Sequence, residues 1–388
     1  MNTPFYRPPI PPDPIFHIGE EFLKDPREDK VDLTVGVYRD EKLQIASLPA
    51  VEEAAHRLQS QEIHHGYLPI GGDPHFLEAA LETAFGEEWE ERKSHLTAIQ
   101  TPGGTGALRI GGEFLRQGMT HTLSLPAPTW PNHYPLFEAA GLTLHHYPYY
   151  QMEGHKMDLN KTLEGISQLT PNSAILFHGS CHNPSGCDPS HGEWEAILDI
   201  VVQRRLLPIF DCAYLGLGEG FHRDRWPLLT AANREIPFLL ALSFSKNAAL
   251  YGERVGALIL HTKGDKEGAS AQMKALARRS YSNPPRYGGR IIATLFEDLA
   301  LKKAWHSQCE GMRQRIESMR SALIEALPPS FSFLSQRKGM FALLGLLPKQ
   351  VEELATSHGI YLTGDGRINL TGLNHHNLNK VAVAIRSL

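Results

Sequence analysis

The chain has 388 residues, of which 41% are hydrophobic and 21% charged, an ordinary balance for a globular protein. Its 38 basic and 43 acidic residues give a net charge of −5, so no basic field for nucleic acid is present. No apolar stretch approaches the roughly 20 residues that span a bilayer, and the N-terminus lacks a charged-then-apolar signal pattern. We therefore expect a cytoplasmic protein that binds neither nucleic acid nor membranes.

Cysteine and histidine usage excludes two further classes. The four cysteines form no C-x-x-C pair, and a chain of this size needs no disulfide framework. The 20 histidines are scattered without ligand spacing, so no metal site is expected.

Short apolar runs alternate with helical spacing through the middle of the chain. The runs cover residues 122–125, 174–177, 207–210, 238–242 and 255–260, and Trp194, Ile197, Leu198 and Val201 recur at helical spacing between two of them. Continuous apolar strands that alternate with amphipathic helices favour an α/β fold with a mostly parallel sheet covered on both faces. In such sheets ligands bind beyond the carboxyl ends of the strands.

The C-terminal part has a different pattern. Residues 304–327 are spaced as one long helix, and the tail then mixes short strands and helices at 331–333, 340–346, 350–357 and 367–370. We predict a large domain at 46–311, a smaller α+β domain made of 16–45 plus 312–388, and a proline-rich N-terminal arm at 1–15. An arm with that many prolines cannot pack alone, so it is either disordered or laid across a partner.

The most informative segment is Leu242-Ser243-Phe244-Ser245-Lys246-Asn247, which ends an apolar strand and is soon followed by Arg254-Val255-Gly256. A lysine amine forms a Schiff base with an aldehyde, and two hydroxyls with a guanidinium hold a phosphate dianion. Pyridoxal 5'-phosphate (PLP) requires that combination. The alternative is a surface lysine after an ordinary buried strand.

The glycine-rich turn at residues 102–108, which leads into a helix, also indicates anion binding. Glycines let backbone amides approach an anion, and a helix N-terminus adds a favourable dipole. A simple turn is one alternative. A dinucleotide loop is another, but Arg109 stands where its third glycine would be and no acidic residue ends the following strand.

Four further side chains lie at predicted strand ends. Asp211 can pair with a protonated pyridine nitrogen and Tyr214 can donate to a ring oxygen, or Asp211 can be a helix N-cap. Trp130 can cover a planar ring or belong to the core. Asn183 offers an amide donor at the same rim, or serves as a turn residue.

In combination these segments resemble the class I aspartate/aromatic amino acid aminotransferase family. The resemblance runs from Asp13 to the C-terminus, and four motifs carry it: Ser243-x-Ser245-Lys246-Asn247 with Arg254-Val255-Gly256, residues 101–108, residues 177–184, and Tyr281-Ser282-Asn283-Pro284-Pro285. It implies fold type I of the PLP-dependent transferases, a homodimer with composite active sites, and amino acids and 2-oxo acids as substrates.

The resemblance also implies roles for individual residues. Lys246 is similar to the Schiff-base lysine and proton shuttle, Asp211 to the pyridine-nitrogen partner, and Tyr214 and Asn183 to the ligands of the phenolic oxygen. Trp130 resembles the ring-stacking residue and His133 its support. The cofactor phosphate is expected to be held by Gly103, Gly104, Thr105, Ser243, Ser245, Arg254 and, from the neighbouring subunit, Tyr67, which is also counted among the catalytic residues.

Substrate recognition is implied in the same way. Arg367 resembles the clamp on the substrate α-carboxylate, with Gly36 nearby and with Trp130 and Asn183 also in contact with substrate. Arg278 matches the residue that reaches across the dimer to a distal carboxylate. Pro128 and Pro184 fall where the family uses cis-prolines.

Three departures from the family pattern bear on substrate breadth. Residues 339–345 are more aliphatic than in aspartate enzymes, Ile45 stands where threonine is common, and Gly66 stands where asparagine is common. We predict a PLP-dependent aminotransferase acting on aspartate or aromatic amino acids with 2-oxoglutarate. The alternatives are a β-decarboxylase or lyase on the same fold, a strictly aromatic aminotransferase, a non-enzymatic binding protein, and a nicotinamide dehydrogenase.

Overall fold

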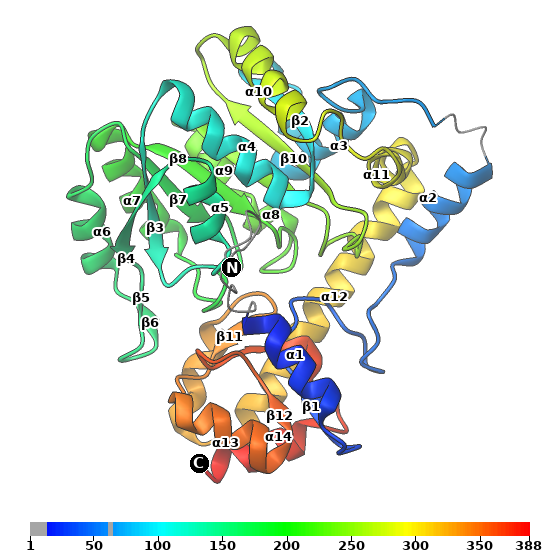
Figure 1. Ribbon diagram of the computed structural model, residues 1–388, viewed down its shortest axis with the longest axis vertical. Helices are drawn as coiled ribbons and strands as arrows, with labels where there is room; N and C mark the ends of the chain where they lie inside the picture. Colours follow the sequence, from blue (N-terminus) through cyan, green and yellow to red (C-terminus); the bar gives the residue numbers. More distant parts are fainter. Residues whose placement is uncertain (1–13, 61–64) are drawn as a thin grey trace, which may run out of the picture.

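The computed structural model describes residues 14–60 and 65–388, so the arm predicted at 1–15 lies almost entirely outside the described residues. Within the described part, a seven-stranded sheet forms the centre of the larger region in the upper half of Figure 1. Its strands follow the spatial order β2, β10, β9, β8, β7, β3, β4. Their bounds are β2 (Leu96–Pro102), β3 (Thr122–Ala127), β4 (Thr143–Pro148), β7 (Ala174–His178), β8 (Leu207–Cys212), β9 (Phe238–Ser243) and β10 (Val255–His261).

The sheet is mostly parallel, as predicted, and all five predicted strands are present. β10 pairs antiparallel with both of its neighbours, β9 and β2, while the pairs from β9 to β4 are parallel. The sequence analysis did not find β2 and β4. β4 is an edge strand with a largely exposed, histidine-containing surface, so it lacks the continuous apolar run by which the inner strands were recognised.

Helices cover both faces of the sheet. Successive strand residues point to opposite sides, and in the inner strands the residues on both sides are apolar and need to be buried. Leu239 and Ala241 of β9 pack in the same cluster as α4, α5 and α10, whereas Leu240 and Leu242 belong to the opposite cluster. On the first face lie α4 (Gly103–Gly118), α5 (His133–Ala139) and α10 (Lys266–Ser280). On the second lie α3 (Pro74–Phe85), α7 (His191–Arg204), α9 (Trp226–Asn233) and α11 (Tyr287–Glu297).

The ends of these helices follow from local sequence. Ser190 caps α7 through a reciprocal capping box, in which Glu193 N donates to Ser190 Oγ and Ser190 N donates to the Glu193 carboxylate. Asp298 accepts hydrogen bonds from Ala300 N and Leu301 N, so the long helix α12 (Leu299–Ala326) begins five residues before the predicted position 304.

The remaining elements connect or flank this core. They are α2 (Pro49–Ser60), which packs on α11 and α12, α6 (Leu159–Ser167), α8 (Phe221–Asp224), the hairpin of β5 (Tyr150–Gln151) and β6 (Lys156–Met157), and the short 3₁₀ helices η1 (Gly86–Trp89), η2 (Lys93–His95), η3 (Pro329–Gln336) and η4 (Leu370–Gly372). The element predicted at 331–333 is thus part of the 3₁₀ helix η3.

A smaller region occupies the lower part of Figure 1 and combines both ends of the described chain around the end of α12. β1 pairs in parallel with β12, and β11 pairs antiparallel with β13. Its elements are α1 (Pro14–Lys24), β1 (Val31–Asp32), β11 (Phe341–Leu343), α13 (Pro348–His358), β12 (Ile360–Tyr361), β13 (Arg367–Asn369) and α14 (Leu378–Arg386).

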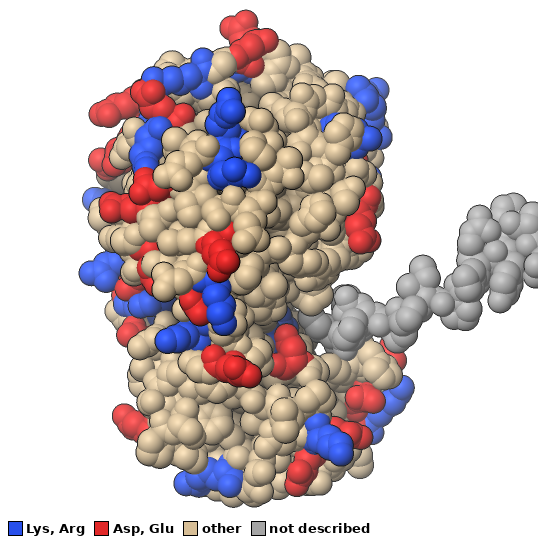
Figure 2. All heavy atoms as spheres, turned by 90° about the vertical axis from the view of Figure 1, so that its left-hand side faces the viewer, with Lys and Arg blue, Asp and Glu red and all other residues tan. Residues whose placement is uncertain are grey.

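The surface carries charges of both signs. On the face in Figure 2, lysine and arginine side chains are interspersed with aspartate and glutamate, and neither sign forms a continuous field. In residues 14–60 and 65–388 no helix combines the length and apolar character needed to cross a membrane.

Candidate active site

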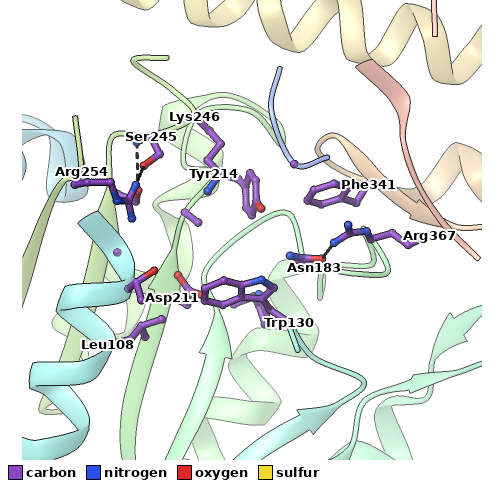
Figure 3. A pocket seen from close by; sticks show the side chains of 16 residues that line it. Leu108, Trp130, Asn183, Asp211, Tyr214, Ser245, Lys246, Arg254, Phe341 and Arg367 are labelled. Carbon is purple, nitrogen blue, oxygen red and sulfur yellow. Dashed lines mark hydrogen bonds between the residues drawn. The ribbon is translucent and has the colours of Figure 1, made fainter. Parts of the chain in front are cut away.

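A cavity of about 150 Å³ opens at the carboxyl ends of the parallel strands, where the smaller region meets the sheet. Figure 3 shows Arg254 and Ser245 at one end, Asn183 and Arg367 at the other, and Lys246 beside Tyr214 between them. Thirteen of the lining residues come from the larger region and three, Gly36, Phe341 and Arg367, from the smaller one. The lining residues are Gly36, Gly104, Thr105, Leu108, Trp130, His178, Asn183, Asp211, Ala213, Tyr214, Ser243, Ser245, Lys246, Arg254, Phe341 and Arg367.

The end of the cavity next to α4 is built to hold an anion. Arg254 Nη1 donates to Ser245 Oγ at 3.3 Å and to the backbone oxygen of Tyr251 at 2.9 Å, which directs the guanidinium toward the helix N-terminus. Gly103 begins α4 at φ +73°, and a Cβ there would lie 2.6 Å from Nη2 of Arg254. Glycine is therefore needed for the guanidinium and the helix N-terminus to share one anion.

Lys246 lies in the middle of the cavity. Its Nζ is 5.2 Å from the centroid of the Tyr214 ring. Burial, partly opposed by the charge of Asp211 and supported by the charge of Arg254, lowers the pKa of Lys246 to about 8. At neutral pH a larger share of this amine is unprotonated than for an ordinary lysine, so it can act as a nucleophile and as a base.

Asp211 also lines the cavity and is ionised. Burial raises the pKa of Asp211, but the hydrogen bond from His133 and the positive charge of Lys246 help to bring it below its usual value. His133 Nε2 lies 3.0 Å from Asp211 Oδ2, and its Nδ1 lies 2.8 Å from Thr129 Oγ1. A buried carboxylate that accepts a hydrogen bond from an imidazole and forms no ion pair with a described lysine or arginine is a site for a cation.

Behind Asp211 a series of hydrogen bonds runs through two histidines and Thr129, and each donor in it can be assigned. Thr129 Oγ1 also lies 3.0 Å from His178 Nε2, and burial lowers the pKa of His178 to about 3, so this imidazole is neutral. His178 can then donate to Thr129, Thr129 to His133 Nδ1, and His133 to the ionised Asp211. This order fixes the imidazole of His133 with its Nε2 proton toward the carboxylate.

Arg367 defines the far end of the cavity. Its Nη1 donates to Asn183 Oδ1 and its Nη2 to the backbone oxygen of Thr34, each at 2.9 Å, and its Cζ lies 4.3 Å from the centroid of the Phe341 ring. The side chain is 3% exposed, its Nε has no hydrogen-bond partner, and no described carboxylate forms an ion pair with it. A buried guanidinium without a counter-ion, at the mouth of a cavity, is a site for a carboxylate ligand.

Asn183 links this guanidinium to the rest of the cavity. Because a guanidinium only donates, the Asn183 oxygen must face Arg367, which leaves the Asn183 amide NH₂ as a donor for a ligand. Tyr214 supplies a second hydroxyl, and burial raises the pKa of Tyr214 well above its usual value, so it stays protonated and can donate. The Ala127–Pro128 and Asn183–Pro184 peptide bonds are both cis, as the family resemblance implied.

Most of the predicted site residues meet in this cavity, but three do not line it. Gly103 lies behind Arg254, as described above. Tyr67 is 92% exposed, and Arg278 is exposed on α10 and hydrogen bonds to Ser282 Oγ. These two residues were expected to serve the site of a second subunit, and this chain alone does not bring them to its own cavity.

The sequence analysis did not assign a role to four lining residues, Leu108, His178, Ala213 and Phe341, or to Thr129 behind them. The sequence did carry a signal for His178, namely its position at the end of an apolar strand. It is the last residue of β7, Asp211 lies near the end of β8, and the two residues are paired across these neighbouring strands. Leu108 and Ala213 are apolar residues in core-like runs and carry no such signal.

The cavity fits PLP on the chemistry of its donor groups. One cavity brings together an amine, a helix N-terminus with an arginine beside it that suits a phosphate, and an ionised carboxylate that suits a pyridinium nitrogen. The flat indole of Trp130 lines the same space and meets the His133 ring edge-on at 5.2 Å between centroids. The fold and this site together define a PLP-dependent enzyme of fold type I.

Comparison with known proteins agrees. The family model "Aminotransferase class I and II" matches residues 28–385, and the chain therefore belongs to that family. An aromatic-amino-acid aminotransferase from Pseudomonas aeruginosa is 39% identical, with 97% of this chain and 96% of the relative covered. An aspartate aminotransferase from Haemophilus influenzae is 37% identical, with 97% of each chain covered.

A solved structure gives the same result. The chain matches the crystal structure of an aromatic-amino-acid aminotransferase from Burkholderia pseudomallei, covalently bound to pyridoxal phosphate, with a TM-score of 0.96 and 35% identity. The match covers 100% of this chain and 99% of that one. The protein is an aminotransferase, and its cofactor is PLP.

Proposed function

We propose that this aminotransferase moves an amino group between aspartate or an aromatic amino acid and 2-oxoglutarate. The observation that carries the proposal is Arg367, a buried guanidinium without a counter-ion that faces the cavity across from Lys246. The relatives named above include both aspartate and aromatic-amino-acid enzymes, which supports both substrate classes.

Each step of the reaction draws on a group already described. The fork of Arg367 binds the substrate α-carboxylate, and Asn183 keeps the guanidinium in place. When bound, PLP supplies the electron sink for the charge that develops as the Cα proton leaves. The amine of Lys246, with a pKa of about 8, would accept the Cα proton as a base and, once protonated, could donate it again as an acid. Asp211, whose pKa lies below its usual value, stays ionised and would hold the protonated ring nitrogen of PLP.

The distal end of the substrate needs a second subunit. We propose a homodimer in which Arg278 of the partner subunit binds the side-chain carboxylate of aspartate or glutamate and the partner subunit's Tyr67 completes the phosphate site. The exposure of both side chains, and their absence from their own subunit's cavity, support this arrangement. Arg278 lies in the last turn of α10, and its hydrogen bond to Ser282 restricts its direction.

Aromatic substrates require an apolar surface near the entrance. Ile45 is 61% exposed and Phe341 begins the apolar strand β11, which leads to Leu343 and Leu344. An aromatic side chain buries about 150–250 Å², enough to compensate for a lost ion pair with Arg278. We therefore propose that Ile45 favours acceptance of phenylalanine and tyrosine.

The domain division and the cellular location remain proposals as well. The β1–β12 pairing supports a small domain of residues 16–45 plus 312–388, beside a large one at 46–311. Four free, buried cysteines are consistent with a reducing compartment and support a cytoplasmic location.

A substrate panel tests the proposed function. The holoenzyme is mixed with aspartate, phenylalanine, tyrosine or alanine, each with 2-oxoglutarate, and the formation of glutamate and of the corresponding oxo acid is followed. We expect kcat/KM for aspartate and for at least one aromatic amino acid to exceed the value for alanine by on the order of 100-fold, the effect of about 2.7 kcal/mol of side-chain recognition. Release of CO₂ or ammonia in place of an oxoacid would favour the decarboxylase or lyase alternative. Activity with aromatic amino acids alone would favour the strictly aromatic alternative.

A further inference from the structure

A second cavity, of about 350 Å³, is lined in part by Ser335, Arg337 and Lys338, which precede Phe341 in the sequence. It is formed by the loop after β8, by α8, by the C-terminal half of α12, and by the end of η3 with the two residues that follow it. None of its lining residues lines the active-site cavity. They are Leu217, Gly218, Glu219, Arg223, Arg313, Ile316, Glu317, Arg320, Ser335, Arg337 and Lys338.

The lining is strongly cationic, with five basic and two acidic side chains. The two acids are already paired. Glu219 lies 3.0 Å from Lys338 Nζ and 3.2 Å from Arg223 Nη1, and Glu317 lies 2.8 Å from Arg313 Nη1. The acids therefore balance the basic residues at the edge of the cavity and leave its two most buried cations without a carboxylate.

Those two cations are Arg320 and Arg337, which are 7% and 1% exposed. Arg320 Nη2 donates to the backbone oxygen of Gly339 at 2.6 Å, and Arg337 Nη2 donates to the backbone oxygen of His155. Neither forms an ion pair with any described residue, and the Nε of each has no hydrogen-bond partner. Arg337 is also held against aromatic rings, with its Cζ 5.3 Å from the centroid of Phe333.

Two unpaired guanidinium groups beside one cavity are costly, because arginine does not lose its proton in proteins and a buried cation without a counter-ion is destabilising. Burial lowers the pKa of Arg320 and outweighs the opposing charge of Glu317, while the charges of Arg313 and Arg337 lower it further. A bound anion would remove this cost by pairing both groups at once.

The arrangement of donors indicates which anion. Arg320 approaches from α12, whereas Ser335, Arg337 and Lys338 approach from η3 and its continuation. A phosphate group offers acceptor oxygens in several directions, whereas a planar carboxylate is satisfied by one guanidinium fork. We propose that this cavity is a second anion site that binds phosphate or a phosphate monoester between Arg320 and Arg337.

The experiment uses PLP-saturated enzyme, so that the cofactor's own phosphate site is filled and its absorbance reports any displacement. Inorganic phosphate and glycerol phosphate are titrated by calorimetry at constant ionic strength, with chloride as the reference. We expect saturable binding with one site per subunit and no change in cofactor absorbance. Tighter binding of glycerol phosphate would identify a phosphate ester as the ligand, and equal binding would identify phosphate itself.

Variants test the location. Arg320→Gln, which keeps a donor for Gly339, should weaken binding at least tenfold, and Lys338→Gln at the cavity edge at least threefold. Lys349→Gln is the matched control, because Lys349 is exposed on α13 and outside the cavity, and it should bind as the wild type does. If Arg320→Gln fails to fold, Lys338→Gln alone tests the location of the site. The absence of saturable binding in the wild-type holoenzyme, or equal binding in all folded variants, would overturn the proposal. None of these outcomes depends on which amino acid the enzyme uses.

Discussion

Replacing Arg367 with lysine tests the carboxylate clamp most directly. Lysine keeps the positive charge but loses the planar fork, so one of two charge-assisted hydrogen bonds to the substrate is lost. Such a bond contributes about 1.5–3 kcal/mol, which corresponds to a fall in kcat/KM of roughly 10–150-fold. Arg367→Ala loses both bonds, about 3–6 kcal/mol in total, or roughly 10²–10⁴-fold.

The loss should be the same for aspartate and phenylalanine, because both present an α-carboxylate. Steady-state kinetics with both substrates provides the measurement, and cofactor absorbance shows that PLP is still bound. Arg315→Lys is a matched control, since the Arg315 guanidinium also donates to backbone oxygens, those of Asp40 and Leu373, but lies outside the active-site cavity. A loss below threefold in Arg367→Lys, with PLP bound, would refute the assignment of Arg367 to the α-carboxylate.

Four further predictions concern the cofactor and the dimer. Borohydride should leave PLP covalently attached to the peptide that contains Lys246, and a colourless protein that gains no absorbance with PLP would contradict this. Asp211→Ala should lower kcat by roughly 10–1000-fold. A close carboxylate raises the pKa of a neighbouring cation by about 1–3 units, and each unit corresponds to about 1.4 kcal/mol. A near-normal kcat would mean that another group serves the ring nitrogen. In cofactor-free protein the amine of Lys246 is mostly unprotonated above its pKa of about 8. The rate of covalent PLP incorporation should therefore rise with pH, with its midpoint at that pKa. A midpoint near the ordinary lysine value of about 10.4 would be inconsistent with a buried amine. Mixing inactive Lys246→Ala with inactive Arg278→Ala protein should restore activity through one intact hybrid site, and no recovery after verified subunit exchange would argue against a shared site.

The larger part of the active site was predictable because its chemistry is local in sequence. Lys246, Ser243 and Asp211 sit at or just beyond the ends of apolar strands, and parallel strands bring such ends to one edge of a sheet. The direction of β10 was not predictable, because a strand buried on both faces is apolar throughout and carries no mark of its orientation.

Other features depend on packing that no local pattern records. Thr129 and His178 act through His133, which precedes His178 by 45 residues, and only the hydrogen bonds through Thr129 and a ring contact between the two imidazoles connect them. Phe341 was visible only as part of an apolar run, and it reaches the cavity because β11 pairs with the strand that contains Arg367. Tyr67 and Arg278 do not line the cavity of their own chain, and their assignment to the site of a second subunit comes from the family resemblance.

The antiparallel turn from β9 to β10 has a consequence for how the enzyme assembles. The connection spans residues 244–254, is closed by a hydrogen bond of 3.0 Å from Phe244 N to Val255 O, and contains both Lys246 and Arg254. Closing so short a loop costs little chain entropy, so the amine and the phosphate-binding guanidinium can come together before distant parts of the sheet have paired. Asp211 and Arg367 join only through contacts of long sequence separation, which form more slowly. A partly folded chain could thus hold PLP by its aldehyde and phosphate before it is able to catalyse transamination.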